Sequence, residues 1–352
     1  MTEAASTEQA QAVLQHFELA GASVRRLGSG LINDTFAVQA TDSAWVLQRV
    51  HTVFSPQIHH NIVAVTEHLR AAGVTTPLLR RTQDGQPWYE DEHGRAWRVM
   101  TRLPGVTFDA VRSAAQAHAA AATLARFHGA LSDLDHAFVG LRTGVHDTPK
   151  HLDNLRAAVQ THREHRLYDE VAPLADAILA AAEALPSLTS IPARVVHGDP
   201  KLNNVVFAGL YGDDVHRAVG LIDLDTVAPM ALHLELGDAW RSWCNPKGED
   251  EAAAQFDFGV FEASVRGYAS AGVVSPEERG ALVHGVELIS VELASRFLAD
   301  ALAESYFGWN ADKYASRGEH NLVRARGQWS LHQAALEGRH ARETLLRAVF
   351  CG

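Results

Sequence analysis

The sequence predicts an α+β protein with two lobes, in which a small β-rich part precedes a larger and mainly helical part. The chain has 352 residues, which is too long for one ordinary core and fits two associated lobes or domains. Short segments rich in Val, Phe and Trp, bounded by turn residues, occupy about the first hundred positions, as expected for strands. Patterns of helical period, many of them rich in alanine, occupy most of the remainder.

The β-rich part is expected to begin with a short amphipathic helix, in which Val13, Leu14 and Phe17 recur at helical spacing. A second helical pattern ends at Gly73. Strand-like segments lie between and after these helices, and the turn at 91–94 joins the last two strands as a hairpin. The expected elements are the helices 7–18 and 58–72 and the strands 23–27, 35–40, 44–50, 86–90 and 96–102.

The helical part follows Pro104-Gly105, which ends the pattern of strands. Two short β segments interrupt this part, and each of them leads into polar residues. After residue 235 nearly the whole chain has a helical pattern. The expected β segments are 194–197 and 218–223, and the expected helices include 109–134, 149–166, 169–185, 256–271, 276–304 and 319–349.

Composition limits the classes of partner. The formal net charge of −11 argues against a general nucleic-acid binder, which needs a concentrated basic surface. Cys244 and Cys351 are the two cysteines, so a disulfide framework or a structural zinc site is not expected, which fits a reducing compartment. The start of the chain is polar and acidic, and no stretch approaches the ~20 apolar residues of a membrane span. We therefore expect a cytoplasmic protein that binds neither nucleic acid nor membrane.

The most informative segment runs from residue 195 to residue 207. An apolar strand leads into the polar loop His197-Gly-Asp199-Pro-Lys201-Leu-Asn-Asn204, and an apolar strand leaves it. A second apolar strand then ends in the acids of Ile222-Asp223-Leu-Asp225. Each residue alone is ordinary turn material, and a lone histidine is more often packed than catalytic. The ordered pair of segments is what indicates function.

Phosphoryl transfer from ATP explains this combination of residues. One carboxylate can orient a hydroxyl and take its proton, and Asp199 is the candidate base. Mg²⁺ prefers carboxylate and amide oxygens, so Asn204 and Asp223 are the candidate ligands. A cation stabilises the charge that develops on the transferred phosphoryl group, a role for Lys201. We expect His197 to steady the loop and Asp225 to tie it down by hydrogen bonds.

These motifs resemble those of the aminoglycoside phosphotransferase and choline kinase superfamily, whose members are related to protein kinases. Further segments are similar to those of bacterial N-acetylhexosamine 1-kinases. Together they extend over nearly the whole chain, and those near the C-terminus are the ones that point to the sugar 1-kinase branch. The segments are 30–36, 46–50, 61–69, 97–100, 146–150, 223–227, 237–241, 296–300, 306–307 and 320–326.

The resemblance implies a protein-kinase-like fold. Its small nucleotide-binding lobe would comprise residues 1–101, and the helical lobe with the catalytic loop and the acceptor site would comprise residues 102–352. A hinge near 100–105 would place Met100 beside the nucleotide. The resemblance also implies ATP and Mg²⁺ in the cleft, with phosphate transfer to the anomeric hydroxyl of a hexose or N-acetylhexosamine.

The nucleotide-binding lobe departs from the protein-kinase pattern in two places, and its helix glutamate is uncertain because Glu67 sits late in the helix whereas Asn61 lies nearer the expected position. The Gly-rich loop has no third glycine, so backbone N–H groups and the residues Gly28, Ser29, Gly30 and Asn33 are the candidates for phosphate contact. The strand lysine is absent, and either Gln48 or Arg49 would take its place. Strand alternation allows only one of these two side chains to face the cleft.

Candidate acceptor-site residues are His146, Asp147, Asp238, Arg241 and Arg296. Each also has a structural interpretation, as a turn, a helix cap or an ion pair. An aminoglycoside-, choline- or homoserine-type kinase would share the chemistry but not the acceptor. A pseudokinase that binds nucleotide without turnover is the alternative from a different class.

Overall fold

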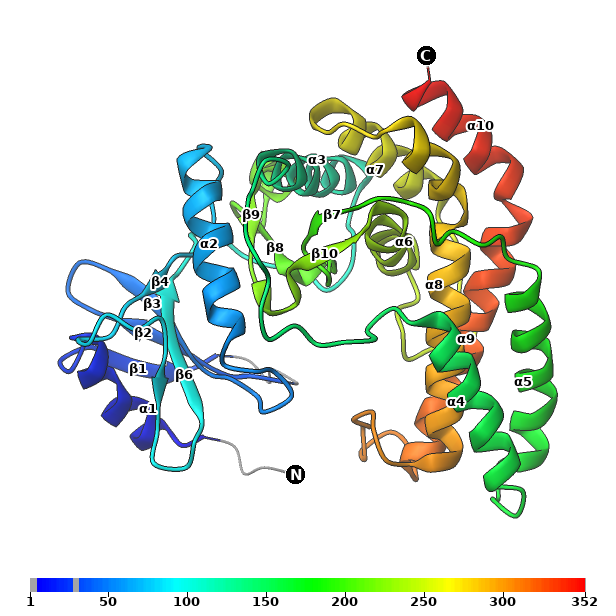
Figure 1. Cartoon of the computed structure of the whole chain (residues 1–352), viewed down its shortest axis with the longest axis horizontal. Coiled ribbons are helices and arrows are strands. Elements are labelled where there is room, and N and C mark those ends of the chain that lie inside the picture. Colours follow the sequence, from blue (N-terminus) through cyan, green and yellow to red (C-terminus); the bar gives the residue numbers. More distant parts are fainter. Residues whose placement is uncertain (1–4, 28–31, 352) are drawn as a thin grey trace.

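The computed structural model describes residues 5–27 and 32–351. A small sheet with its helices forms one lobe, and a larger assembly of helices with two short antiparallel strand pairs forms the other (Figure 1). This arrangement confirms the predicted two-lobed α+β fold. None of the described helices combines the length and the apolar character that a membrane span needs.

The small lobe is built on an antiparallel sheet whose described strands run in the order β1-β2-β3-β6-β4, with β5 paired to β6. One face of the sheet presents Phe36, Leu47, Trp97 and Val99, which pack in a core with Phe17 of the N-terminal segment. The elements of this lobe are β1 (Ser23–Arg26), β2 (Asp34–Gln39), β3 (Ala44–Arg49), β4 (Leu79–Arg80), β5 (Tyr89–Glu90), β6 (Ala96–Thr101), α1 (Thr7–Val13) and α2 (Ile58–Ala71).

The opposite face of the sheet turns toward α2 and the other lobe (Figure 1). Helix α2 belongs to the small lobe by its place in the sequence, yet its apolar residues Ile58, Ile62, Val65 and Leu69 pack in the same core cluster as residues of the large lobe. The two lobes are therefore joined by buried apolar contacts as well as by the connecting chain.

In the large lobe α8 contacts α4, α5, α6, α9 and α10, while α3 packs against α7. Two strand pairs, β7 with β10 and β8 with β9, lie where this lobe meets the small one (Figure 1). The helices are α3 (Ala114–Ala130), α4 (Thr148–Thr161), α5 (Tyr168–Glu183), α6 (Leu232–Trp243), α7 (Phe258–Ala271), α8 (Pro276–Ala303), α9 (Arg317–Glu337) and α10 (Arg339–Phe350). The strands are β7 (Ala193–Val196), β8 (Val205–Phe207), β9 (Ala218–Leu221) and β10 (Ala228–Ala231).

Several predicted boundaries differ from the structure. The expected helix 319–349 is two helices that meet at Gly338, and the helix expected from residue 109 begins only at Ala114, after the Ser113 cap. The strand expected at 218–223 ends at Leu221. The start of α3 is set by capping, because the Ser113 hydroxyl accepts from the N–H of Gln116 and the helix begins at the next residue.

Candidate active site

The loop that carries Asp199 is held from two sides. Glu235 of α6 accepts hydrogen bonds from the backbone N–H groups of His197 (3.0 Å) and Gly198 (2.9 Å). The buried His197 donates from Nε2 to the carbonyl of Ile222 (2.8 Å), and its Nδ1 accepts from the N–H of Asp199 (3.3 Å). These contacts are those of a histidine that shapes the loop.

Gly198 lets this loop pass close to the neighbouring chain. Its φ is +82°, in the region that favours glycine. A Cβ atom at this position would lie 2.3 Å from the carbonyl oxygen of Thr226. A side chain is therefore excluded here both by backbone conformation and by space, and the turn that aims Asp199 depends on glycine.

Asp199, Lys201 and Asn204 come together at the end of this loop. The Nδ2 group of Asn204 donates to the Asp199 carbonyl (2.8 Å) and to its carboxylate (3.3 Å). The Lys201 ammonium lies 3.4 Å from the other carboxylate oxygen, and this negative charge raises the pKa of Lys201. The Asp199 side chain keeps 30% of its surface exposed, so a small molecule can reach a carboxylate that is already oriented.

Asp223 lies in a turn directly beside this loop. The N–H of Ile222 donates to the carbonyl of Asn204 (2.9 Å), which ties the two segments together. Asp223 itself has a φ of +64°, an uncommon conformation for a residue with a side chain and one that persists only when its surroundings enforce it. Burial, followed by the charges of Asp225 and Asp199, raises the pKa of Asp223 to about 6.

Asp225 is the residue that fixes this turn. Its carboxylate is buried and accepts hydrogen bonds from Asn33 (Nδ2 to Oδ2, 2.8 Å) and from Arg98 (Nη1 to Oδ1). Burial opposes ionisation, but the Arg98 charge and these hydrogen bonds outweigh it and lower the pKa of Asp225. The hydrogen-bonding role expected for Asp225 is therefore what its contacts provide.

The sheet places Gln48 and Arg49 on opposite faces. Gln48 is directly across from Arg98 on β6 and accepts from its guanidinium at 3.0 and 2.7 Å, on the face that turns toward the cleft. Arg49 lies on the other face, where it bonds to Asp34 (2.8 Å) and stacks over Trp97. Of the two candidates, Gln48 is the one on the cleft side.

Of the residues predicted to contact phosphate, Gly28, Ser29 and Gly30 lie outside the described residues. The described Asn33 follows them and points its amide at Asp225.

Arg98 was missed as a site residue by the sequence analysis, although the segment 97–100 had contributed to the resemblance. The sequence does contain a feature that marks this residue, because Arg98 is the one charged residue in the mainly apolar segment from Ala96 to Thr101.

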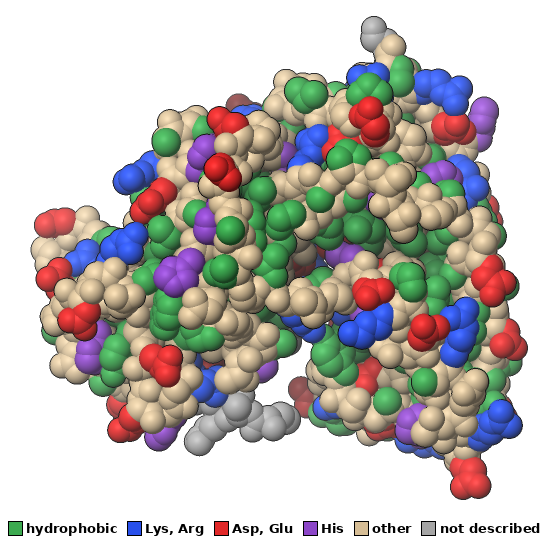
Figure 2. Space-filling model, in the orientation of Figure 1, with side chains coloured by type: hydrophobic (Ala, Val, Ile, Leu, Met, Phe, Trp, Pro, Cys, Tyr) green, Lys and Arg blue, Asp and Glu red, His purple; other side chains and the backbone are tan. Residues whose placement is uncertain are grey.

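The cleft between the lobes narrows to a pocket with apolar walls and a polar end. Met100 and Asp223 both line it, so the structure brings the predicted hinge residue and the predicted metal ligand to one cavity. A mainly apolar lining with a few polar groups is the usual composition of a small-molecule site. The lining residues are Ile62, Pro77, Leu79, Arg98, Met100, Asp223 and Leu224. The space-filling view shows the lobes in contact above and a notch opening between them below (Figure 2).

The donor set beside this pocket fits a magnesium ion. The Nδ2 end of Asn204 is turned to Asp199, which leaves the amide oxygen at the opposite end available to a cation. Burial and, after it, the charges of Asp225 and Asp199 raise the pKa of Asp223, and a divalent cation would offset that negative charge. No group of three or more His, Cys, Asp or Glu side chains in the described parts of the chain forms a metal site unaided. Mg²⁺ is commonly held by one or two carboxylates together with substrate phosphates.

Helix α6 contributes a buried pair of opposite charges near Asp199. Together with the charged residues Glu292 and Arg296 of α8, this pair is called the wall below. Asp238 and Arg241 form an ion pair of 2.8 Å, and both residues are buried. Burial opposes ionisation of Asp238, but the Arg241, His146 and Lys201 charges lower its pKa. Burial lowers the pKa of Arg241, but the charges of Asp238, Glu249 and, less strongly, Asp199 outweigh it and raise that pKa. These mutual effects place the α6 pair within electrostatic reach of the catalytic loop.

The wall continues onto α8 through Glu292, a residue that the sequence analysis did not single out. Glu292 accepts from His146 (2.9 Å) and from the hydroxyl of Thr148 (2.6 Å), and Arg296 lies 3.9 Å from it. Burial opposes protonation, but Glu292 raises the pKa of His146. His146 and Arg296 are thus gathered with Asp238. The exposed Asp147 caps α4 by accepting from the N–H of Lys150 (3.2 Å).

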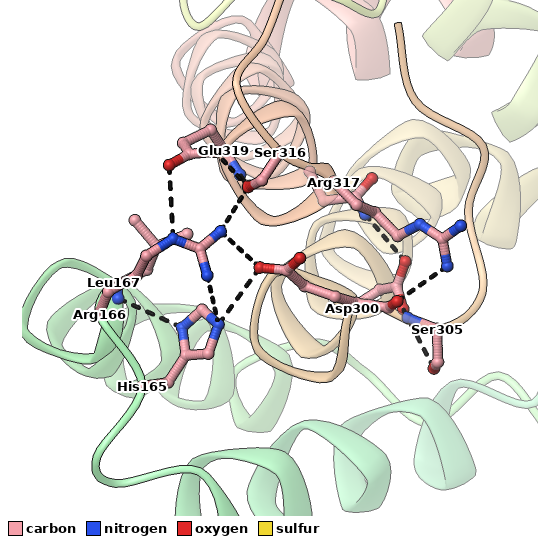
Figure 3. A network of polar contacts seen from close by, with 10 residues as sticks. His165, Arg166, Leu167, Asp300, Ser305, Ser316, Arg317 and Glu319 are labelled. Atoms are coloured by element: carbon pink, nitrogen blue, oxygen red, sulfur yellow. Dashed lines mark hydrogen bonds and ion pairs between the residues drawn. The ribbon is translucent and has the colours of Figure 1, made fainter. Parts of the chain in front are cut away.

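The far end of α8 is anchored by a separate polar network (Figure 3). Arg166, from the segment before α5, bonds to Glu304 (2.5 Å) and to Ser316. Asp300 accepts three backbone N–H bonds of 2.8 Å from Ser305, Tyr306 and Phe307. This network fixes the chain between α8 and α9, and Phe307 lies under the Arg296 guanidinium.

The chain matches known phosphotransferases in sequence and fold. The family model described as "Phosphotransferase enzyme family" matches residues 23–271. The homoserine kinase of Granulibacter bethesdensis is 28% identical over 282 residues, covering 78% of this chain and 80% of that protein. The homoserine kinase of Methylobacterium nodulans is 26% identical over 307 residues, covering 83% of this chain and 84% of that protein.

Solved structures share the fold at low identity. A microcompartment-associated aminopropanol kinase has a TM-score of 0.63 at 16% identity, covering 95% of this chain and 98% of that one. An aminoglycoside phosphotransferase from Alicyclobacillus acidocaldarius also has a TM-score of 0.63 at 16% identity, covering 99% of this chain and 97% of that one. The comparisons confirm the predicted superfamily, whereas the narrower resemblance to N-acetylhexosamine kinases stays a prediction. With the family model covering most of its length, the chain belongs to the phosphotransferase enzyme family and is a small-molecule kinase.

Proposed function

We propose that the protein transfers the γ-phosphate of ATP, with Mg²⁺, to a hydroxyl group of a small polar molecule bound between the Asp199 loop and the wall formed by α6 and α8. The observation that carries this proposal is the environment of Asp199. Its carboxylate is partly exposed, held by Asn204 and accompanied by Lys201. Its charge also acts both on Asp223, which lines the pocket, and on Arg241 of the buried pair on α6.

Each residue then has a defined task. Asp199 accepts a hydrogen bond from the acceptor hydroxyl, orients its oxygen toward the γ-phosphorus and takes its proton as the new O–P bond forms and ADP leaves. Lys201 offsets negative charge on the transferred phosphoryl group. Asn204 and Asp223 would hold Mg²⁺, which neutralises phosphate charge when bound.

The first candidate acceptor is a hexose or N-acetylhexosamine, phosphorylated at its anomeric hydroxyl. A sugar offers hydroxyls on all sides and needs several hydrogen bonds in fixed positions. The wall supplies donors and acceptors in balanced pairs, Asp238 with Arg241 and Glu292 with Arg296. A strongly cationic acceptor such as choline or an aminoglycoside would favour a surplus of acidic groups beyond these pairs, and Glu249, whose charge acts on Lys201 and Arg241, keeps that alternative open.

Homoserine is the second candidate, and two observations favour it. Both curated relatives described above are homoserine kinases. Homoserine carries one positive and one negative charge, which a wall containing paired acids and arginines can also accommodate. In this case the side-chain hydroxyl of homoserine would lie beside Asp199.

One assay separates these acceptors. ADP release is measured with Mg·ATP and single acceptors from a panel of hexoses, N-acetylhexosamines, homoserine, choline and aminoglycosides, with Asp199→Asn as the control for contaminating activity. The product is then identified by phosphorus NMR. An anomeric phosphate supports the sugar proposal, and O-phosphohomoserine supports the second candidate. Nucleotide binding without turnover of any hydroxyl compound would overturn the catalytic proposal in favour of the pseudokinase alternative.

A further inference from the structure

Three polar side chains form a row across the cleft face of the small sheet. Thr35, Gln48 and Arg98 are direct cross-strand partners on β2, β3 and β6. Gln48 donates to the Thr35 hydroxyl (3.1 Å) and accepts twice from the Arg98 guanidinium. The row therefore holds the guanidinium in one orientation, with only 1% of the Arg98 side chain exposed.

The end of this row crosses from the small lobe to the large one. The Nη1 group of Arg98 donates to Oδ1 of Asp225, and Asn33 donates to Oδ2 of the same carboxylate at 2.8 Å. Asn33 is itself fixed because its Oδ1 accepts from the N–H of His51 (2.9 Å). Two separate segments of the small lobe thus bind the two carboxylate oxygens of Asp225, which belongs to the large lobe.

Helix α2 offers Arg98 no acidic partner. In protein kinases the cation of the nucleotide-binding sheet is paired with a glutamate of the corresponding helix. Here the α2 residue within electrostatic reach is His59. Burial, followed by the Arg98 charge, lowers the pKa of His59 to about 4, and its Nε2 has no hydrogen-bond partner in the described parts of the chain. His59 is therefore neutral, and the charge that balances Arg98 is that of Asp225.

We propose that Arg98 is a positioning residue for phosphoryl transfer, which sets the Asp223–Asp225 turn relative to the nucleotide-binding sheet. The left-handed Asp223 conformation needs support from its surroundings. The residue before Asp223 is held by the hydrogen bond from the Ile222 N–H to the Asn204 carbonyl. On the other side of Asp223, the Asp225 carboxylate is held by Arg98. Arg98 thus determines where the Asp223 carboxylate lies relative to a nucleotide on the sheet. This inference rests on the proposed metal role of Asp223.

The test compares arginines of the same sheet. Arg98→Gln removes the charge, and Arg98→Lys keeps the charge but loses the forked geometry. Arg80→Gln is the matched control, because Arg80 of β4 also bonds within the small lobe, to the carbonyl of Phe17 (2.6 Å), and stacks on Trp45. Calorimetry measures the binding of AMP-PNP with and without Mg²⁺, which requires no acceptor, and steady-state kinetics gives kcat and KM wherever an acceptor is turned over.

We expect both Arg98 variants to lose about 10- to 100-fold in Mg²⁺-dependent nucleotide affinity or kcat, the usual effect of removing a residue that orients a metal ligand. Metal-free nucleotide binding should change much less. Arg80→Gln should lower the melting temperature while Mg²⁺-dependent binding stays near that of the unmodified protein. In an Asp225→Asn background, Arg98→Gln should add little, because the two changes break the same link.

Two outcomes would overturn the inference. One is a folded Arg98→Lys or Arg98→Gln protein with unaltered Mg²⁺ dependence and kcat. The other is full additivity of Arg98→Gln and Asp225→Asn. If Arg98→Gln does not fold, Arg98→Lys and Asp225→Asn decide the question by the same measurements. Asn204→Ala tests the metal proposal separately, so a loss of Mg²⁺ dependence there with none at Arg98 refutes only the positioning role.

Discussion

At the scale of single residues, the site contains carboxylates in contrasting environments. Asp199 is partly exposed beside Lys201, whereas Asp223 and Asp225, two positions apart in the chain, have opposite pKa shifts. Burial raises the pKa of Asp223 to about 6, while Arg98 outweighs burial and lowers that of Asp225. These environments suit one acid that meets the acceptor, one that meets a cation and one that holds the turn.

Replacing Asp199 tests the proposed base. Asp199→Asn is close in shape and should leave the fold and nucleotide binding nearly intact. Without a carboxylate to orient the hydroxyl and take its proton, kcat should fall by a factor on the order of 10² or more. Steady-state kinetics with the best acceptor measures this, and near-normal turnover would rule Asp199 out as the base.

The proposed metal ligands are tested by truncation. Asn204→Ala and Asp223→Ala should each weaken nucleotide binding in the presence of Mg²⁺, and Asp223→Ala should weaken it more because it removes a full negative charge. Calorimetric titration at several Mg²⁺ concentrations gives the effect. In a crystal grown with nucleotide and Mg²⁺, both side chains should lie within about 2.5 Å of a metal, and a site made without either of them would contradict the assignment.

The acceptor wall makes a prediction about KM. Asp238→Ala or Arg296→Ala should raise KM for the acceptor more than KM for ATP, since a missing hydrogen bond to a substrate costs about 1–3 kcal/mol. Asp238→Ala also leaves the buried Arg241 without its ion-pair partner. Asp238→Asn is therefore measured beside it, as a substitution that disturbs the fold less. Arg326→Ala is the control because Arg326 forms an exposed pair with Glu170. Equal changes in both KM values would place these residues outside the acceptor site.

At the scale of elements, the crossing of α6 and α8 positions the acceptor wall. A Cβ atom on Gly237 would lie 2.5 Å from the backbone of Gly285, and one on Gly285 would lie 2.2 Å from the carbonyl oxygen of His233. The two helices therefore approach backbone to backbone at a pair of glycines. Asp238 and Glu292 lie on these helices, so the crossing sets the distance between the two halves of the wall.

Adding one methyl group at this crossing should disturb both stability and acceptor binding. Gly237→Ala should destabilise the protein by about 1–3 kcal/mol through overpacking and raise KM for the acceptor. Gly280→Ala on α8, the partner helix in this crossing, is the control, since no described atom outside its own stretch of helix lies within 4 Å of the added Cβ, and it should be neutral or slightly stabilising. Urea unfolding and kinetics report the two effects, and a Gly237→Ala protein as stable as the Gly280 variant would show that α6 can shift freely.

At the scale of the whole molecule, buried charge pairs join elements that are distant in the chain. Asp225 joins the lobes through Arg98 and Asn33. Glu287 joins α8 to α10, because it bonds to Arg339 (2.5 Å) and to the buried Arg342. Burial opposes the ionisation of Glu287, but its His284, Arg339 and Arg342 partners lower its pKa from an ordinary value of 4.5 to about 2.

This shift predicts a pH dependence of stability. A carboxyl group with a lowered pKa in the folded state stabilises that state fully above its unfolded pKa, and the stabilisation is lost as pH falls toward the folded value. Glu287→Gln should therefore cost about 3–5 kcal/mol near pH 7, where it leaves Arg342 unpaired. The difference from the unmodified protein should shrink between pH 4.5 and about pH 2. Urea unfolding at several pH values measures this difference in the free energy of unfolding. A difference that stays constant with pH would show that ionisation of Glu287 does not cause the pH dependence.

The amino-acid sequence alone was enough to predict the two-lobed α+β fold and the phosphotransferase chemistry. Strands and helices follow from local periodicity, and the proposed catalytic groups are neighbours in the chain. Asp199, Lys201 and Asn204 lie within six positions, so the loop that gathers them is visible as a motif. Asp223 and Asp225 are recognisable for the same reason, since they follow one apolar strand closely in the chain.

Tertiary structure alone decided which side chains meet across the lobes. Strand alternation separates Gln48 from Arg49, but only the packed sheet shows that Gln48 faces the cleft. Arg98 bonds to Asp225 across 127 positions, and His146 bonds to Glu292 across 146 positions. No local pattern encodes such pairs, because their geometry depends on how the lobes and helices pack after each element has formed.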